Sequence, residues 1–262
     1  MARKPREKSG TGIYHVMLRG INKQDIFEDE EDFSMFRGLL FHMVYYKDEQ
    51  GTLQPSRCTI YAYCLMTNHV HLLIRETEED LATVIKRISV AYALYYNNKY
   101  QRAGHLFQNR YRSEPVNDPA YFIMLLRYIH QNPVAAGVTK SVDAYMWSSW
   151  KEYESNNSST HKICTTSPVL KLMPFAELRE LVFEPLPKAS QILDFDNESK
   201  RRTDEELKAF LSDSFDLRKP SDLQHYSHDR RQEILRSAKQ FGASIRQLER
   251  LTGITFTIIR MA

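Results

Sequence analysis

Hydrophobic residues recur with two different periods along the first half of the chain, and the period predicts the kind of element. Runs rich in β-branched and aromatic residues predict strands, and apolar residues at a spacing of three or four predict helices. The predicted strands cover residues 13–19, 58–66, 70–74 and 113–117, and the predicted helices cover residues 32–46 and 81–100.

A further helix is predicted from Asp118-Pro119, since Asp is a favoured N-cap and Pro is favoured at the first helical position. We expect it to end near Pro133, because a proline disfavours helical geometry in the residue before it. The order is therefore β-α-β-β-α-β-α. It predicts an α+β domain with a ferredoxin-like (split βαβ) antiparallel sheet and helices packed on it.

The rest of the chain changes character twice. Residues 154–168 are polar and predict a linker, and the acidic stretch after them contains short helical runs at Phe175–Phe183 and 203–211. Residues 229–240 and 254–261 then predict helices, with Ser244 and Gln247 in capping-box spacing between them. This pattern favours a helix-turn-helix DNA-binding region, with a plain helical hairpin as the alternative.

These observations predict three parts: a domain over residues 1–153, a linker and acidic helical segment over 154–225, and a helix-turn-helix region over 226–262. The net charge of +3 is small, but basic runs at residues 99–113 and 229–262 flank an acidic stretch. Separate basic segments suggest two surfaces for a polyanion, and solvated helix faces are the alternative.

Composition excludes several classes of protein. A hydrophobic fraction of 42% and a charged fraction of 26% suit a folded protein with a polar surface. No stretch approaches the ~20 apolar residues of a membrane helix, and no apolar signal core follows the basic N-terminus. The three cysteines are scattered and form no CxxC pair. We expect a cytoplasmic protein without a membrane partner.

Two histidines, His69 and His71, lie two residues apart in a predicted strand. Side chains at this spacing point to the same face of a sheet, which leaves Val70 to the core. Two neutral imidazoles on one face can chelate a divalent metal ion. The alternative is a pair of ordinary polar strand residues.

Tyr128 and Asn132 lie four residues apart and therefore share one face of the predicted helix. The amide oxygen of Asn132 could complete a metal site, with Tyr128 beside it. A phenol is a poor nucleophile at its usual pKa near 10, but a cation that polarises a phosphate makes phosphorus more electrophilic. The product would be a phosphotyrosine link to DNA. Tyr121, seven residues earlier, is the rival nucleophile.

Basic and aromatic residues interleave in the segment GHLFQNRYR at residues 104–112, which includes Gln108, Arg110 and Arg112. Arginines can hold phosphates while aromatic rings stack on unpaired bases, which is how many proteins bind single strands. A structured surface loop is the alternative.

Taken together, the motifs resemble the single-tyrosine HUH transposases, and most closely the branch associated with repetitive extragenic palindromes (REP). The matching segments are TyrHisVal at 14–16 with Arg19-Gly20, YAYCLMTNHVHLLI at 61–74, GHLFQNRYRS at 104–113, and YIHQNPVAAGV at 128–138 followed by WSSW at 147–150. The resemblance covers residues 12–150, and its four separated motifs occur in the family's order.

The resemblance implies a ferredoxin-like domain that acts on single-stranded or hairpin DNA with Mg²⁺ or Mn²⁺. By motif, His69 and His71 are the paired ligands, Tyr128 the nucleophile and Asn132 the third ligand. Gln131 is a lesser candidate for the third ligand, because related enzymes use a glutamine. Thr67 departs from the family, where a proline is common.

The expected DNA-binding residues are Arg19, Gln108, Arg110, Arg112, Arg246 and Arg250. The leading hypothesis is a metal-dependent single-stranded DNA endonuclease and transposase that cleaves and rejoins hairpin-associated DNA through a covalent phosphotyrosine intermediate, with a homodimer as one possible assembly. Two alternatives are a catalytically silent DNA-binding regulator that uses the helix-turn-helix and the basic loop, and an RNA-binding ferredoxin-like domain.

Overall fold

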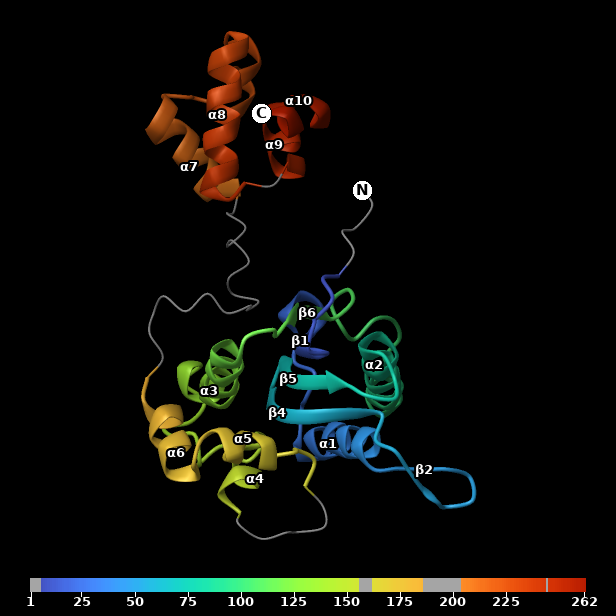
Figure 1. The fold of residues 1–262 in the computed structure, drawn as a ribbon. Coiled ribbons are helices and arrows are strands. Elements are labelled where there is room, and N and C mark those ends of the chain that lie inside the picture. Colours follow the sequence, from blue (N-terminus) through green and yellow to red (C-terminus); the bar gives the residue numbers. More distant parts are fainter. Residues whose placement is uncertain (1–5, 156–161, 186–203, 244) are drawn as a thin grey trace. The chain divides into compact units, whose positions relative to one another are not determined.

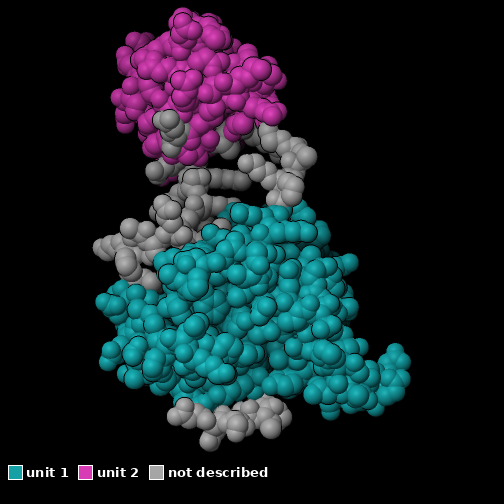
Figure 2. Space-filling view, viewed as in Figure 1, with its two compact units in different colours: residues 1–192 teal, residues 193–262 magenta. Residues whose placement is uncertain are grey.

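The computed structural model describes residues 6–155, 162–185, 204–243 and 245–262. The chain divides into two compact units, residues 1–192 and 193–262, coloured separately in Figure 2. No helix within the described ranges is long and apolar enough to cross a membrane. Each unit has its own buried apolar core and is described by itself below.

A four-stranded antiparallel sheet is the centre of the first unit (Figure 1). Its strands follow the order β4-β5-β1-β6, and every pair of neighbours is antiparallel. The elements follow the chain order β1 (Ile13–Arg19), α1 (Glu30–Val44), β4 (Cys58–Met66), β5 (His69–Glu76), α2 (Leu81–Lys99), β6 (Arg112–Pro115) and α3 (Pro119–Ala135). Between them lie the short 3₁₀ helix η1 (Ile21–Lys23) and a hairpin of β2 (Tyr46–Lys47) and β3 (Leu53–Gln54).

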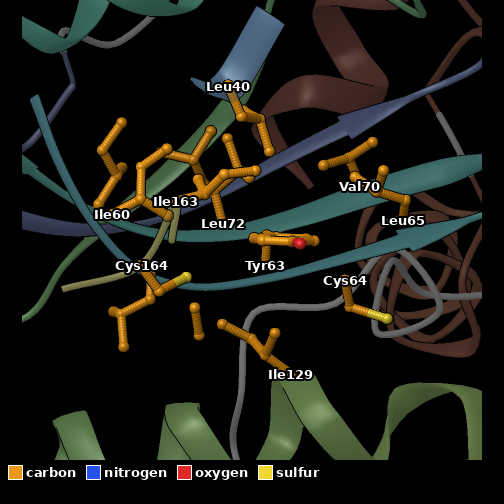
Figure 3. Close-up of a cluster of buried hydrophobic side chains, with 14 of the residues drawn as sticks. Leu40, Ile60, Tyr63, Cys64, Leu65, Val70, Leu72, Ile129, Ile163 and Cys164 are labelled. Carbon is orange, nitrogen blue, oxygen red and sulfur yellow. The ribbon is translucent and has the colours of Figure 1, made fainter. Parts of the chain in front are cut away.

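Helices cover both faces of this sheet. Alternate side chains of a strand point to opposite faces, so each face contributes buried residues to the core. Val70 and Leu72 face Leu40 of α1, while Cys64 faces Ile129 of α3 on the other side (Figure 3). Helices α1, α2 and α3 each have an aspartate as N-cap. The carboxylates of Asp29, Asp80 and Asp118 accept a hydrogen bond from a backbone amide in the first turn of their helix. The predicted α+β class with an antiparallel sheet is confirmed.

Helix α3 differs from the prediction in its C-terminal end. It continues through Pro133 to Ala135. The proline is buried, and the helix closes beyond it with the amide of Ala136 donating to the carbonyl of Asn132 at 3.0 Å. Tertiary packing therefore outweighs the local cost of a proline within the last turn.

The segment predicted as a linker belongs in large part to the first unit. Ile163 and Cys164 are buried, and the amide of Thr165 donates to the carbonyl of Ile60 at 2.8 Å. Helix α4 (Trp150–Glu154) precedes this segment in the chain, and α5 (Ser167–Leu172) and α6 (Phe175–Phe183) follow it. A boundary at residue 153 therefore does not separate two compact parts, since apolar side chains from both sides of it share one core.

The second unit is helical. It contains α7 (Asp204–Phe215), the 3₁₀ helix η2 (Pro220–His225), α8 (His228–Phe241), α9 (Ile245–Thr252) and α10 (Phe256–Met261). Leu207 and Leu211 of α7 are buried in its core, so the unit begins before the predicted boundary at 226. Gly253, at φ 71°, makes the turn between α9 and α10. The predicted cap at Ser244 lies outside the described residues.

His130 anchors α3 to the sheet and makes folding sensitive to acid. Its Nδ1–H donates to the Leu126 carbonyl at 2.8 Å, and its Nε2 accepts from the Ser149 hydroxyl at 2.8 Å. Burial lowers the pKa of His130 to about 4. The unfolded chain therefore binds a proton below about pH 6.5 that the folded protein does not bind until about pH 4, and stability falls as the pH falls through this window.

We expect His130→Gln to reduce the loss of stability between pH 7 and pH 5 by about 2 kcal/mol relative to the unchanged protein. Urea unfolding followed by tryptophan fluorescence measures this, because the chain has two tryptophans, Trp147 and Trp150, and both lie in the first unit. Equal pH dependence in the two proteins would contradict the account.

Candidate active site

Three histidines lie on the face of the sheet that α3 covers. Strand β5 contributes His69, partly exposed, and His71, fully buried, while Val70 points to the opposite face. Strand β1 contributes His15, which is also fully buried. The ring of His15 stacks on that of His71 with centroids 5.3 Å apart, and its Nε2 lies 3.0 Å from Nδ1 of His71.

Helix α3 places an amide between the two β5 histidines. Asn132 Oδ1 lies 3.2 Å from Nε2 of His69, and Asn132 Nδ2 lies 3.3 Å from Nε2 of His71. The ring centroids of His69 and His71 are 4.9 Å apart. One sheet strand and one helix therefore bring two imidazole nitrogens and one amide oxygen together.

The hydrogen bonds around this group show where the protons lie. Asn68 Nδ2 donates to the Lys23 carbonyl at 3.3 Å, which turns Asn68 Oδ1 toward Nδ1 of His69 at 2.6 Å. His69 thus carries its proton on Nδ1, and the lone pair of its Nε2 faces the Asn132 carbonyl oxygen. Two facing lone pairs are favourable only with a cation or proton between them.

His71 is held in the form that a metal ligand needs. Burial, followed by the charges of His69 and His15, lowers the pKa of His71 well below its usual range. The neutral imidazole is the form that binds a cation. Among the described residues, no three His, Cys, Asp or Glu side chains form a metal-holding group. A site here therefore needs the amide of Asn132, and its donor set of two imidazoles and one carbonyl oxygen fits a divalent cation with open positions.

The two tyrosines of α3 have different surroundings. The ring of Tyr128 meets His71 edge-on with centroids 5.4 Å apart, and it lies 6.0 Å from the ring of His15. The hydroxyl of Tyr121 instead donates to Glu114 at 2.6 Å. Burial and this carboxylate raise the pKa of Tyr121 above its usual range. Tyr128 is thus the tyrosine beside the histidines.

Gln131 points away from the histidines. Its amide nitrogen donates to the carbonyl of Val182 at 2.6 Å and to that of Glu184. Arg127, one turn earlier, donates to the same Glu184 carbonyl at 3.1 Å through its Nε. Gln131 and Arg127 therefore hold the end of α6 against α3, and Asn132 is the amide that reaches the candidate site.

Two of the expected DNA-binding arginines flank this site. Arg19, 7% exposed, is paired with His69 across β1 and β5, and Arg112 is paired with Met17 across β6 and β1, so both share the histidine face. Burial, followed by the charge of Arg19, lowers the pKa of Arg112. Gln108 and Arg110 are exposed, and the amide of Gln108 donates to the Arg19 carbonyl at 2.7 Å. The loop therefore lies along the end of β1.

The other two expected DNA-binding residues, Arg246 and Arg250, belong to the second unit. Arg250 of α9 forms an ion pair with Asp204 at 2.8 Å, and its side chain is 66% exposed. The side chain of Arg246 is outside the described part of the chain.

Two residues of the site were not predicted to have a role. These are His15, within the segment TyrHisVal at 14–16, and Asn68, directly before His69. His15 lies at the same alternation as Arg19, which could have placed both on one face. Its contact with His71 could not be predicted, because it depends on the register that pairs Met17 with His71.

Comparison with known protein families finds a match in the first unit. Residues 9–132 match the model of a family described as "Transposase IS200 like". The matched residues include His15, His69, His71, Tyr128 and Asn132. This part of the chain is similar to the IS200-like transposases.

Among solved structures, the chain is similar to one described as "Structure of the REP associates tyrosine transposase bound to a REP hairpin". The two are 14% identical, with a TM-score of 0.48, over 74% of this chain and 95% of that chain. No curated protein matches the chain.

The turn after β1 positions Asn68, and it requires glycine. The amide of Gly20 donates to the carbonyl of Asn68 at 2.9 Å. A Cβ at Gly20 would lie 2.2 Å from the Gln24 carbonyl oxygen and 2.9 Å from Cγ2 of Ile26. We expect Gly20→Ala to lower the free energy of unfolding by about 1–3 kcal/mol.

Gly38→Ala is the matched control, since nothing lies within 4 Å of a Cβ there and the residue is inside α1. It should stabilise by up to about 1 kcal/mol. Urea unfolding read by tryptophan fluorescence compares the two variants. Equal effects of both would show that the turn tolerates a side chain.

Proposed function

We propose that the protein is a metal-dependent single-stranded DNA endonuclease and transposase that works through a covalent link between Tyr128 and DNA. The observation that carries the proposal is the meeting of Tyr128 and Asn132, from one helix, with His69 and His71, from one strand. The match of this segment to IS200-like transposases supports it.

His69, His71 and Asn132 would hold Mg²⁺ or Mn²⁺ through two Nε2 atoms and Oδ1. A bound divalent cation would polarise a phosphate oxygen and make phosphorus more electrophilic. The side-chain oxygen Oδ1 of Asn68 keeps the proton of His69 on Nδ1, so that Nε2 is available. The fully buried side of the site, at His15 and His71, excludes water from behind the ligands.

Tyr128 supplies the nucleophile. Its Oη forms a bond to phosphorus, the bond from phosphorus to one DNA oxygen breaks, the phenol proton passes to solvent, and the released DNA oxygen takes up a proton. The phosphodiester energy is retained in the tyrosine ester. Attack of a DNA hydroxyl on that ester would rejoin a strand and return the phenol.

The substrate that fits these surroundings is single-stranded or hairpin DNA. Arg19 and Arg112 place two cations on the histidine face, where they would bind phosphates next to the reacting one. Gln108 and Arg110 are exposed in the adjoining loop. The βαββαβ chain order with strand order β4-β5-β1-β6 supports describing the scaffold as ferredoxin-like.

A second candidate function is a DNA-binding regulator that uses the second unit. Helices α9 and α10 are joined by a turn at Gly253, and the carboxylate of Glu249 accepts from the first amide of α10 at 2.8 Å. Two helices joined by a short glycine turn support the helix-turn-helix interpretation. In this reading the two units act on the same DNA, and the first unit binds without cleaving.

The test is cleavage of labelled hairpin oligonucleotides with single-stranded flanks in Mn²⁺. The unchanged protein should form a covalent protein–DNA band on a denaturing gel, and Tyr128→Phe should form none, because its ring has no hydroxyl. Tyr121→Phe is the matched control and should still form the band. Loss of the band in Tyr121→Phe alone would overturn the assignment of the nucleophile.

Removal of the cation should act in the same assay. With a chelator present, or in His69→Ala, the covalent band should disappear while the shift of the DNA on a native gel persists, since Arg19 and Arg112 are unchanged. A band of full strength without a divalent cation would contradict metal dependence, and DNA shifts without any band across many hairpins would favour the regulator.

Arg112 should contribute to DNA binding through phosphate. We expect Arg112→Gln to weaken binding to a single strand and to lower the slope of log K against log salt by about 0.7, the contribution of one phosphate contact. Arg87→Gln is the control, since Arg87 lies on α2 in an ion pair with Glu79. Fluorescence anisotropy across a salt series measures both, and equal slopes for the two variants would remove Arg112 from the DNA surface.

A further inference from the structure

His15 has no part in the proposed reaction, yet it is fully buried against the site. It lies on β1, and its Nε2 is 3.0 Å from Nδ1 of His71, with the two rings 15° from parallel. A buried imidazole loses its hydration, so this hydrogen bond has to compensate for a desolvated polar group. The contact of His15 with His71 is therefore part of how the fold satisfies its buried polar groups.

The proton between the two rings can be assigned from the neighbouring amide. Asn132 Nδ2 lies 3.3 Å from Nε2 of His71, and an amide nitrogen can only donate. His71 Nε2 is then the acceptor, and the single proton of its neutral ring is on Nδ1. That Nδ1–H donates to Nε2 of His15, whose own proton is on Nδ1.

Both histidines of β5 thus donate their Nδ1–H to an acceptor, but the acceptor belongs to a different residue in each case. His69 donates its Nδ1–H to the Asn68 amide oxygen at 2.6 Å, and His71 donates its Nδ1–H to the His15 ring. Because the proton is on Nδ1 in both rings, the Nε2 of each histidine has a lone pair, which faces Asn132. A metal-binding histidine commonly gives its other N–H to such a partner, which fixes its tautomer and ring orientation.

We propose that His15 is a positioning residue that sets the tautomer of His71 and thereby prepares Nε2 as a ligand. The part that concerns the metal rests on the proposed function. The part that concerns the tautomer stands on the contacts of His15, His71 and Asn132 alone.

The experiment uses the full chain labelled with ¹⁵N-histidine and free of metal. Long-range ¹H–¹⁵N correlation distinguishes an Nδ1–H from an Nε2–H ring, and loss of one set of signals in His71→Asn identifies His71 among the nine histidines. We compare the unchanged protein, His15→Gln, His15→Leu and a control, His42→Leu, at an exposed position of α1.

We expect His71 to carry its proton on Nδ1 in the unchanged protein and in His42→Leu. His15→Gln should retain this tautomer, because its amide oxygen can accept the same hydrogen bond, whereas His15→Leu should lose it. Titration calorimetry with Mn²⁺ should show affinity about 10–100-fold weaker for His15→Leu, with most of it restored in His15→Gln.

An Nε2–H tautomer of His71 in the unchanged protein would overturn the proposal, even if His15→Leu failed to fold. So would a folded His15→Leu with the original tautomer and unchanged Mn²⁺ affinity. Absence of Mn²⁺ binding in the unchanged protein would instead contradict the proposed metal site, and the tautomer measurement would still decide the role of His15.

Discussion

A row of directed hydrogen bonds across one face of the sheet is the interaction on which the candidate site depends. It runs from the Lys23 carbonyl through Asn68 and His69 to Asn132, and from Asn132 through His71 to His15. Except where the lone pair of His69 Nε2 faces the oxygen of Asn132, each contact pairs a donor with an acceptor. The exception is where a cation would sit.

This row exists because of strand register. Antiparallel pairing sets Arg19 opposite His69 and Met17 opposite His71, which puts His15, Arg19 and both β5 histidines on one face. A slip of one residue would turn all the side chains of a strand to the other face, against α1 and α2. The apolar alternation that buries Val16, Leu18, Val70 and Leu72 opposes such a slip, so the hydrophobic core also positions the polar site.

Helix α3 supplies the remaining residues, and several contacts hold it in place. His130 bonds to Ser149, and Gln131 bonds to the carbonyls of Val182 and Glu184, which lie far along the chain. Gln131 and Asn132 are neighbours on α3, and their side chains point in different directions. Gln131 anchors the end of α6, and Asn132 reaches the histidines.

Structural features that depend on neighbouring residues in the chain could be predicted from the sequence, and features that depend on distant contacts could not. The four strands of the sheet and the helices α1, α2 and α3 were predicted within a few residues, because alternation and helical spacing are local signals. The short helix η1 and the β2–β3 hairpin were not predicted. The same-face placement of His69 and His71, and of Tyr128 and Asn132, follows from strand and helix geometry alone. The packing of residues 162–185 was not predicted, since it rests on distant contacts such as that of Thr165 with Ile60. The contact of His15 with His71 is equally non-local.

The identity of the tyrosine that carries DNA tests the central claim most directly. Trypsin cleaves after Arg127, which separates Tyr121, on the peptide of residues 113–127, from Tyr128, on the peptide of residues 128–140. The covalent adduct formed in Mn²⁺ can be digested and its nucleotide-bearing peptide identified by mass spectrometry. The account predicts the nucleotide on the peptide that begins with Tyr128. A nucleotide on the peptide that contains Tyr121 would contradict it.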